Sequence, residues 1–278
     1  MNRRQLLIGL ATGAVVGLAG CSDNGGDTNG TTDENGEETP ENGDNDLTEV
    51  DVSEYPPGLS ETGIDTDEFL ENSPLFSELF SVSYEARELF GDIESEDQYR
   101  DITAQTDIET ATVHRIEDAF DGVRQEQYKV GSTTYNLIVE GDDIVQNRVI
   151  PQVPEEYAFQ PIYDTGYARV TELIELMDIN ESTVYENPDG DYIYEYRSDS
   201  TPEGNFENVD FSVWIHEDGL YQELSLTLET ETDGYMFEIE FSDYGETEIE
   251  EPDWTEDSEE GEVDDIPEDE LPDDEPIG

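Results

Sequence analysis

The chain has 278 residues, of which 76 are Asp or Glu and 10 are Lys or Arg, so its formal net charge is -66. Nucleic acid is excluded as a natural partner, because phosphate binding needs clustered basic side chains and the sequence has one lysine. Residues 51–250 alone hold 51 acids and 8 bases, so the excess is not confined to the ends. This predicts adaptation to molar salt of the haloarchaeal kind, where the Debye length is about 3 Å, rather than an ordinary acidic protein with a disordered tail.

Residues 1–20 are predicted to be a twin-arginine lipoprotein signal peptide. Arg3 and Arg4 precede an uncharged, mostly apolar run from Leu6 to Ala19. Such a run is typical of an export signal and is too short to span about 30 Å of hydrocarbon comfortably. The paired arginines indicate twin-arginine export, although Asn2 and Leu6 depart from the usual residues of that signal.

The segment Leu18-Ala19-Gly20-Cys21 resembles the lipobox of lipoproteins, in which cleavage before the cysteine leaves it N-terminal and lipidated on sulfur. Cys21 is the only cysteine, so neither a disulfide nor a cysteine-based metal site is expected. We expect the protein to be extracellular, at the outer face of the cytoplasmic membrane and anchored by a lipid on Cys21. The alternative is a leftover reactive thiol.

Two acidic segments flank the predicted folded domain, which spans residues 51–252. Residues 21–50 and 253–278 hold few apolar side chains, so they cannot offset the entropy of ordering and are predicted to be a disordered tether and a disordered tail. Asn29 and Asn180 each begin an Asn-x-Ser/Thr sequon, which makes both glycosylation candidates in an exported protein.

Two helical regions are predicted within the domain. The first runs from Thr66 or Asp67 to about Phe80, and Ser73 and Pro74 can begin a second short helix inside it. The second runs from Asp164 to about Asp178. It carries apolar residues at helical spacing, namely Tyr167, Val170, Leu173, Ile174 and Met177.

Alternating apolar residues and turn signals predict about eleven short strands, nearly all antiparallel. The predicted strands lie at 82–90, 98–106, 111–120, 124–130, 133–140, 144–150, 183–186, 191–198, 209–216, 220–230, 235–244 and 246–250. Two helices are too few to cover so many strands laid flat. The expected fold is therefore α+β, with a curved antiparallel sheet forming a half-barrel wrapped around one or two helices.

The C-terminal hairpins resemble those of the LolA/LppX-like lipoprotein-carrier superfamily. The resemblance rests on residues 211–215, 218–219, 224–226 and 237–245 and on Pro252. Residues 55–60 and the lipobox resemble those of haloarchaeal lipoproteins of that general type. The resemblance implies an open half-barrel around helices with a cavity that takes acyl chains or other lipids in characterised relatives. It carries over no catalytic residue, because those carriers do no chemistry.

Apolar and aromatic residues on the inward faces are candidates for lining such a cavity. The candidate residues are Tyr167, Val170, Leu173, Ile174, Met177, Tyr192, Tyr194, Tyr196, Phe237, Ile239 and Phe241. The other interpretation is an ordinary sheet core. Both need the same inward faces, so the sequence leaves the two open.

Nothing in the sequence indicates catalysis. His114 and His216 fall on different predicted strands, and there is neither a His-x-x-x-His pair, a nucleophile elbow nor a phosphate loop. We therefore expect no enzyme, cofactor or metal. The predicted function is that of an exported, lipid-anchored surface protein that binds or carries a lipid or another hydrophobic ligand. The alternative is a non-catalytic structural or interaction module of the cell envelope.

Overall fold

The computed structural model describes residues 47–78, 80–91, 99–119, 122–154, 158–201, 206–230 and 233–261. The predicted export signal with Arg3 and Arg4, the predicted lipidation site Cys21 and the sequon at Asn29 lie outside the described residues. So do the end of the predicted tail after Gly261 and most of the predicted tether.

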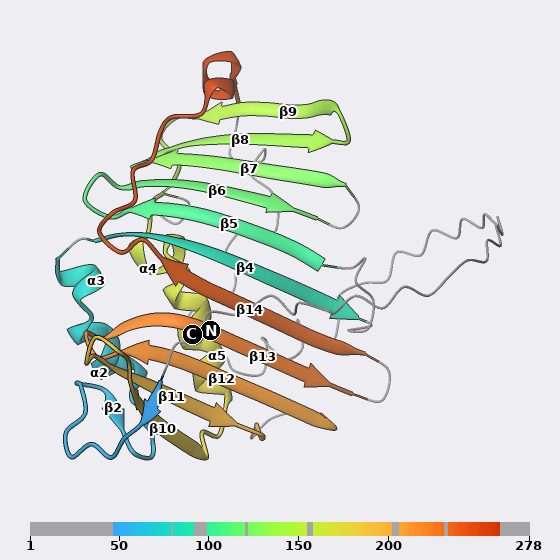
Figure 1. Cartoon of the computed structure of the whole chain (residues 1–278). Coiled ribbons are helices and arrows are strands. Elements are labelled where there is room, and N and C mark those ends of the chain that lie inside the picture. The colour runs from blue at the N-terminus through green and yellow to red at the C-terminus, as the bar shows by residue number, and fades with distance from the viewer. Residues whose placement is uncertain are drawn as a thin grey trace, which may run out of the picture.

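A curved, open antiparallel sheet of thirteen strands dominates the structure (Figure 1). Its order is β1-β10-β11-β12-β13-β14-β4-β5-β6-β7-β8-β9-β15, and only the pairing of β15 with β9 is parallel. The strands are β1 (Thr48–Glu49), β4 (Ser81–Gly91), β5 (Tyr99–Asp107), β6 (Thr112–Asp118), β7 (Val123–Val130), β8 (Thr133–Glu140), β9 (Asp143–Ile150), β10 (Glu181–Glu186), β11 (Tyr192–Ser198), β12 (Asn208–His216), β13 (Leu220–Glu229), β14 (Gly234–Ser242) and β15 (Glu259–Glu260). A separate small hairpin joins β2 (Leu59–Ser60) to β3 (Gly63–Ile64).

The predicted α+β half-barrel is confirmed. Apart from the two-residue strands β1 and β15, the sheet has eleven strands, β4 to β14, which match eleven of the twelve predicted ranges. The predicted strand at 246–250 is wrong, because the chain turns away after β14 at Asp243 (φ 54°) and Gly245 (φ 75°). A further strand could not pair there, since both sides of β14 already bind β13 and β4.

The first predicted helical region contains two helices, α2 (Thr66–Asn72) and α3 (Pro74–Ser77), that meet at Ser73 as the sequence allows. Asp65 caps α2, because its carboxylate accepts a hydrogen bond from the Glu68 amide at 3.0 Å. This arrangement splits the predicted long helix into two short ones.

The second predicted helical region is α4 (Pro161–Asp164) followed by α5 (Tyr167–Leu176), so it starts earlier than predicted and is interrupted. The interruption is at Gly166, which adopts a left-handed φ of 78°. A Cβ at this position would lie 3.2 Å from Ile239 Cδ1, so the glycine also permits close approach to the sheet. Met177 has an extended backbone and ends α5.

We call the side of the sheet that carries α5 the inner face. In Figure 1, α5 lies behind β12–β14, and none of the α-helices in the described ranges lies behind β7–β9. Residues on β14 alternate as predicted, with Tyr235, Phe237, Ile239 and Phe241 buried. Ile239 of β14 pairs with Ala86 of β4. Paired residues face the same side of a sheet, so the inner face continues from β14 onto β4.

The predicted tail has structure in its first part. A 3-10 helix, η3 (Asp253–Asp257), leads to β15, which lies along the edge of β9. The Trp254 indole donates a hydrogen bond to Glu126 Oε1 at 2.7 Å on the outer face. The prediction of disorder from residue 253 is therefore wrong up to Gly261, because a tryptophan and an unpaired strand edge give this acidic segment partners. At the other end, β1 pairs with β10 inside the predicted tether.

None of the helices in the described ranges is long and apolar enough to cross a membrane.

Candidate functional site

The structure places ten of the eleven candidate cavity residues in the hydrophobic core. The exception is Tyr192, which is 36% exposed at the start of β11. The other ten, on α5, β11 and β14 and at Met177, are buried. They therefore share one side of the sheet, as the alternation predicts.

Aromatic rings fill the space beneath the start of α5. Tyr167 is fully buried, and its ring centroid lies 4.7 Å from that of Tyr221, 5.4 Å from that of Phe241 and 5.5 Å from that of Phe76. Phe69 of α2 extends the group, with its centroid 4.8 Å from Tyr221. These are the separations of rings in direct contact. An acyl chain at this place would have to displace them.

Hydrogen bonds hold the Tyr167 ring in place. The Tyr221 amide donates to the Tyr167 hydroxyl at 3.2 Å, and the Tyr167 hydroxyl is 3.1 Å from that of Tyr244. Tyr244 in turn donates to the Tyr221 carbonyl at 2.6 Å, which closes a loop of three bonds. Burial raises the pKa of Tyr167 and of Tyr244. This half of the inner face is a solid core, which is the second interpretation that the sequence allows.

A pocket of about 460 Å³ lies at the other end of α5. It is lined by residues 62–66 and by the end of the helix, including the candidates Ile174 and Met177. Asp65, Glu175 and Asp178 also line it, so the pocket is too acidic to resemble an apolar chain site. The sequon residue Asn180 lies just beyond it, and its side chain donates to Asp199.

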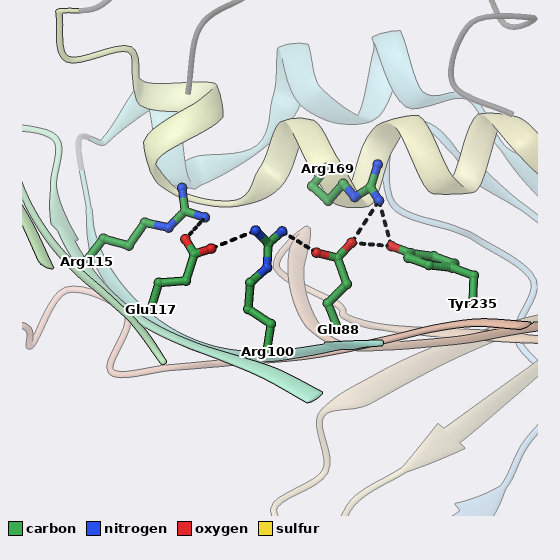
Figure 2. A network of polar contacts seen from close by, with 6 residues as sticks. All are labelled: Glu88, Arg100, Arg115, Glu117, Arg169 and Tyr235. Atoms are coloured by element: carbon green, nitrogen blue, oxygen red, sulfur yellow. Dashed lines mark hydrogen bonds and ion pairs between the residues drawn. The ribbon is translucent and has the colours of Figure 1, made fainter. Parts of the chain in front are cut away.

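A network of charged side chains on the inner face of β4 and β5 reaches α5 through Arg169 (Figure 2). Arg100 joins two carboxylates, at 2.5 Å to Glu88 and 2.7 Å to Glu117. Glu88 also lies 3.3 Å from Arg169 of α5 and accepts a hydrogen bond from the Tyr235 hydroxyl at 2.8 Å. The network therefore ties the helix to three strands, β4, β5 and β14.

The network extends further, since Glu117 also pairs with Arg115 of β6 at 2.9 Å. Burial alone raises the pKa of Glu88, but the charges of Arg100 and Arg169 outweigh it and hold that pKa below its usual value. Glu88 is therefore ionised at neutral pH although it is only 5% exposed. Burial raises the pKa of Tyr235, which stays neutral.

Polar side chains continue across the inner face of β7 and β8. Gln127 Nε2 donates to Asn136 Oδ1 at 3.1 Å, and Lys129 Nζ lies 3.2 Å from Asp164 of α4. Gln127, Asn136 and their neighbour Thr134 are all buried. The inner face of β11–β14 packs aromatic rings, whereas the inner face of β7 and β8 buries amides, a hydroxyl and charges.

Five of the eight bases among the described residues lie on this one face. They are Arg100, Arg115, Lys129, Arg148 and Arg169. We call the inner side of β5–β8, which carries Arg100, Arg115 and Lys129, the polar inner face. This surface was not among the sites predicted from the sequence, because the candidate residues were apolar and aromatic. The available signal was alternation of polar residues, at 113–117, 125–129 and 134–136, within strands that were correctly predicted.

The two histidines lie apart, and each has its own partners. His114 Nε2 is 2.8 Å from Glu126 on the outer face, whereas His216 lies beside Asp191 and Asp218. Burial raises the pKa of Glu126, but hydrogen bonds with His114 and Trp254 outweigh it and lower that pKa to about 2. Within the described part of the chain, no group of three His, Cys, Asp or Glu side chains is arranged to hold a metal ion.

The sequence matches no protein-family model and no curated protein. Among solved structures, the chain is similar to the crystal structure of LprF from Mycobacterium bovis, with 13% identity and a TM-score of 0.36 over 66% of this chain and 95% of that one. It is also similar to the Mycobacterium tuberculosis lipoprotein LppX, with 15% identity and a TM-score of 0.35 over 65% of this chain and 95% of that one. Because both TM-scores are low, the fold is assigned from the strand pairing alone and not from these similarities.

Proposed function

We propose that this is an exported, lipid-anchored surface protein that binds an amphipathic ligand on the inner face of its sheet and does no chemistry. The polar inner face is the observation that carries the proposal. A sheet normally packs apolar residues against its covering layer, and burying amides and charges there costs free energy unless they are matched. Five of the eight bases among the described residues nevertheless lie on this inner face.

The ligand class follows from how the face changes along the sheet. The inner side of β11–β14 is aromatic and aliphatic, and that of β5–β8 is polar. The change occurs within β5, where Ile102 and Ala104 pack in the hydrophobic core and Arg100 joins the charged network. A molecule with an apolar part and a polar head matches this boundary better than a purely apolar one.

Anchoring through Cys21 and export through Arg3 and Arg4 belong to the same proposal. They rest on the sequence, in which a basic start, a short apolar run and a single cysteine stand in the order of a lipoprotein signal. Replacing Cys21 by serine should release the protein from the membrane fraction. Equal membrane retention of Cys21→Ser and the parent chain would refute the anchor.

The alternative is a structural or interaction module of the envelope, which the solid core around Tyr167 favours. Native mass spectrometry of the full chain extracted from its own membrane in high salt separates the two. A mass addition that is released by organic solvent and identified as a lipid supports the binding function. A chain that carries nothing supports the interaction module.

A double variant localises the ligand. Gln127→Leu with Asn136→Leu replaces a hydrogen-bonded pair by apolar groups of similar size, so neither end of that bond is left unsatisfied. We expect this variant to fold and to lose the bound molecule. The control is Thr103→Val on the exposed outer face of β5, which should keep it. Retention of the ligand by both variants would place it elsewhere.

A further inference from the structure

Two buried polar groups on β8 lack a protein partner within the described part of the chain. Asn136 is 2% exposed and Thr134 is 1% exposed, yet neither Asn136 Nδ2 nor Thr134 Oγ1 has a hydrogen-bond partner. Leaving such a group unsatisfied destabilises a fold, so a buried donor normally has a partner. Two of them on one strand face, at alternate positions, call for a common explanation.

The surrounding side chains offer hydrogen-bond donors. Asn136 uses its oxygen to accept from Gln127, so the free end of its amide is the NH₂ group. Lys129 stands opposite Thr134 in the strand register, and Arg115 stands opposite Gln127. An amide NH₂, a hydroxyl, an ammonium and a guanidinium therefore lie on neighbouring strands, on one face.

The acids nearby position these cations. Lys129 is held by Asp164 at 3.2 Å, and Arg115 by Glu117 at 2.9 Å. An ammonium has three donor hydrogens, so the pairing of Lys129 with one carboxylate orients it without using every donor. A metal cation does not fit such a set, because the groups that await a partner on β8 include a donor-only amide nitrogen.

We propose that Thr134 and Asn136, with Lys129 and Arg115 beside them, bind an oxyanion, the phosphate or sulfate group of a lipid head group or a free ion. The inference rests on the proposed binding function, whose polar head it identifies. Tetrahedral oxyanions present several acceptors in different directions, which suits donors that come from three strands. In molar salt, long-range attraction is screened, so selection over chloride depends on these directed hydrogen bonds.

The test compares two neighbouring threonines of β8. Thr134→Val removes a hydroxyl that has no protein partner, so it should leave the fold intact. Thr133→Val is the matched control, because Thr133 points to the opposite face. The full chain in molar KCl is titrated separately with inorganic phosphate and with short-chain phosphatidylglycerol below its micelle concentration, and binding is followed by phosphorus NMR line width.

We expect the parent chain and Thr133→Val to broaden the phosphorus line equally, and Thr134→Val to bind about tenfold more weakly, the effect of losing one hydrogen bond to a charged group. Broadening by the lipid alone assigns the site to a head group, and equal broadening by both probes assigns it to the oxyanion itself. Binding of neither probe, or equal affinity in the two valine variants, would overturn the proposal. A lipid that still co-purifies with Thr134→Val in that case leaves the proposed binding function standing without the oxyanion site.

Discussion

Replacing Tyr167 by phenylalanine tests whether the space beneath α5 is solid. The change keeps the ring contacts with Tyr221 and Phe241 and removes only the hydroxyl. That hydroxyl accepts the hydrogen bond of the buried Tyr221 amide, which would lose its partner. An unsatisfied buried amide costs about 1–3 kcal/mol, so we expect a loss of about 2 kcal/mol in the free energy of unfolding.

The assay is thermal unfolding in molar KCl, followed by near-ultraviolet circular dichroism. For a domain of this size, about 2 kcal/mol corresponds to a fall of roughly 4–8 °C in Tm. The control is Tyr163→Phe, the same change at a tyrosine that is 61% exposed, which should leave Tm unchanged. If the two variants unfold at the same temperature, water reaches the Tyr221 amide. The space beneath α5 would then be a hydrated pocket and the solid-core argument would be wrong.

Three further predictions concern pH and salt. The buried tyrosines Tyr167 and Tyr244 have a raised pKa in the fold, so the stability they contribute is complete below the ordinary pKa of 10 and is lost as pH rises above it. Absorbance at 295 nm should show them ionising only together with unfolding. Glu126, whose pKa of about 2 lies below the ordinary 4.5, contributes stability above pH 4.5 that disappears as pH falls through 2, and tryptophan fluorescence should report release of the C-terminal segment. Glu223 and Glu240 pair directly across β13 and β14, so Glu240→Lys should lower the KCl concentration needed for folding, as measured by circular dichroism.

Local patterns were enough to predict the strands and their turns. Alternation on β14 predicted which residues are buried, because a strand side chain can face only one side of a sheet. Ser73 and Pro74 indicated the break between α2 and α3 for an equally local reason, the missing amide of proline. The same rules failed at 246–250. The residues there favour a strand, but β14 just before them already pairs with β13 on one edge and with β4 on the other.

Features that depend on distant pairing were not predicted from the sequence. The polar inner face exists because the register places Arg115 opposite Gln127, and Gln127 opposite Asn136. The C-terminal segment is ordered because Trp254 meets Glu126, which lies 128 positions earlier in the sequence.

The sequence by itself determined that the protein has a curved antiparallel sheet and which residues face its inside, since both follow from period-2 alternation and from the shortage of helices. Only the tertiary structure decided what that inside contains. The break at Gly166 lets α5 approach the sheet closely and seat Tyr167 among the aromatic rings, which fills one half of the face. The other half holds buried donors, because strand register, which no single strand encodes, brings polar positions of β6, β7 and β8 side by side.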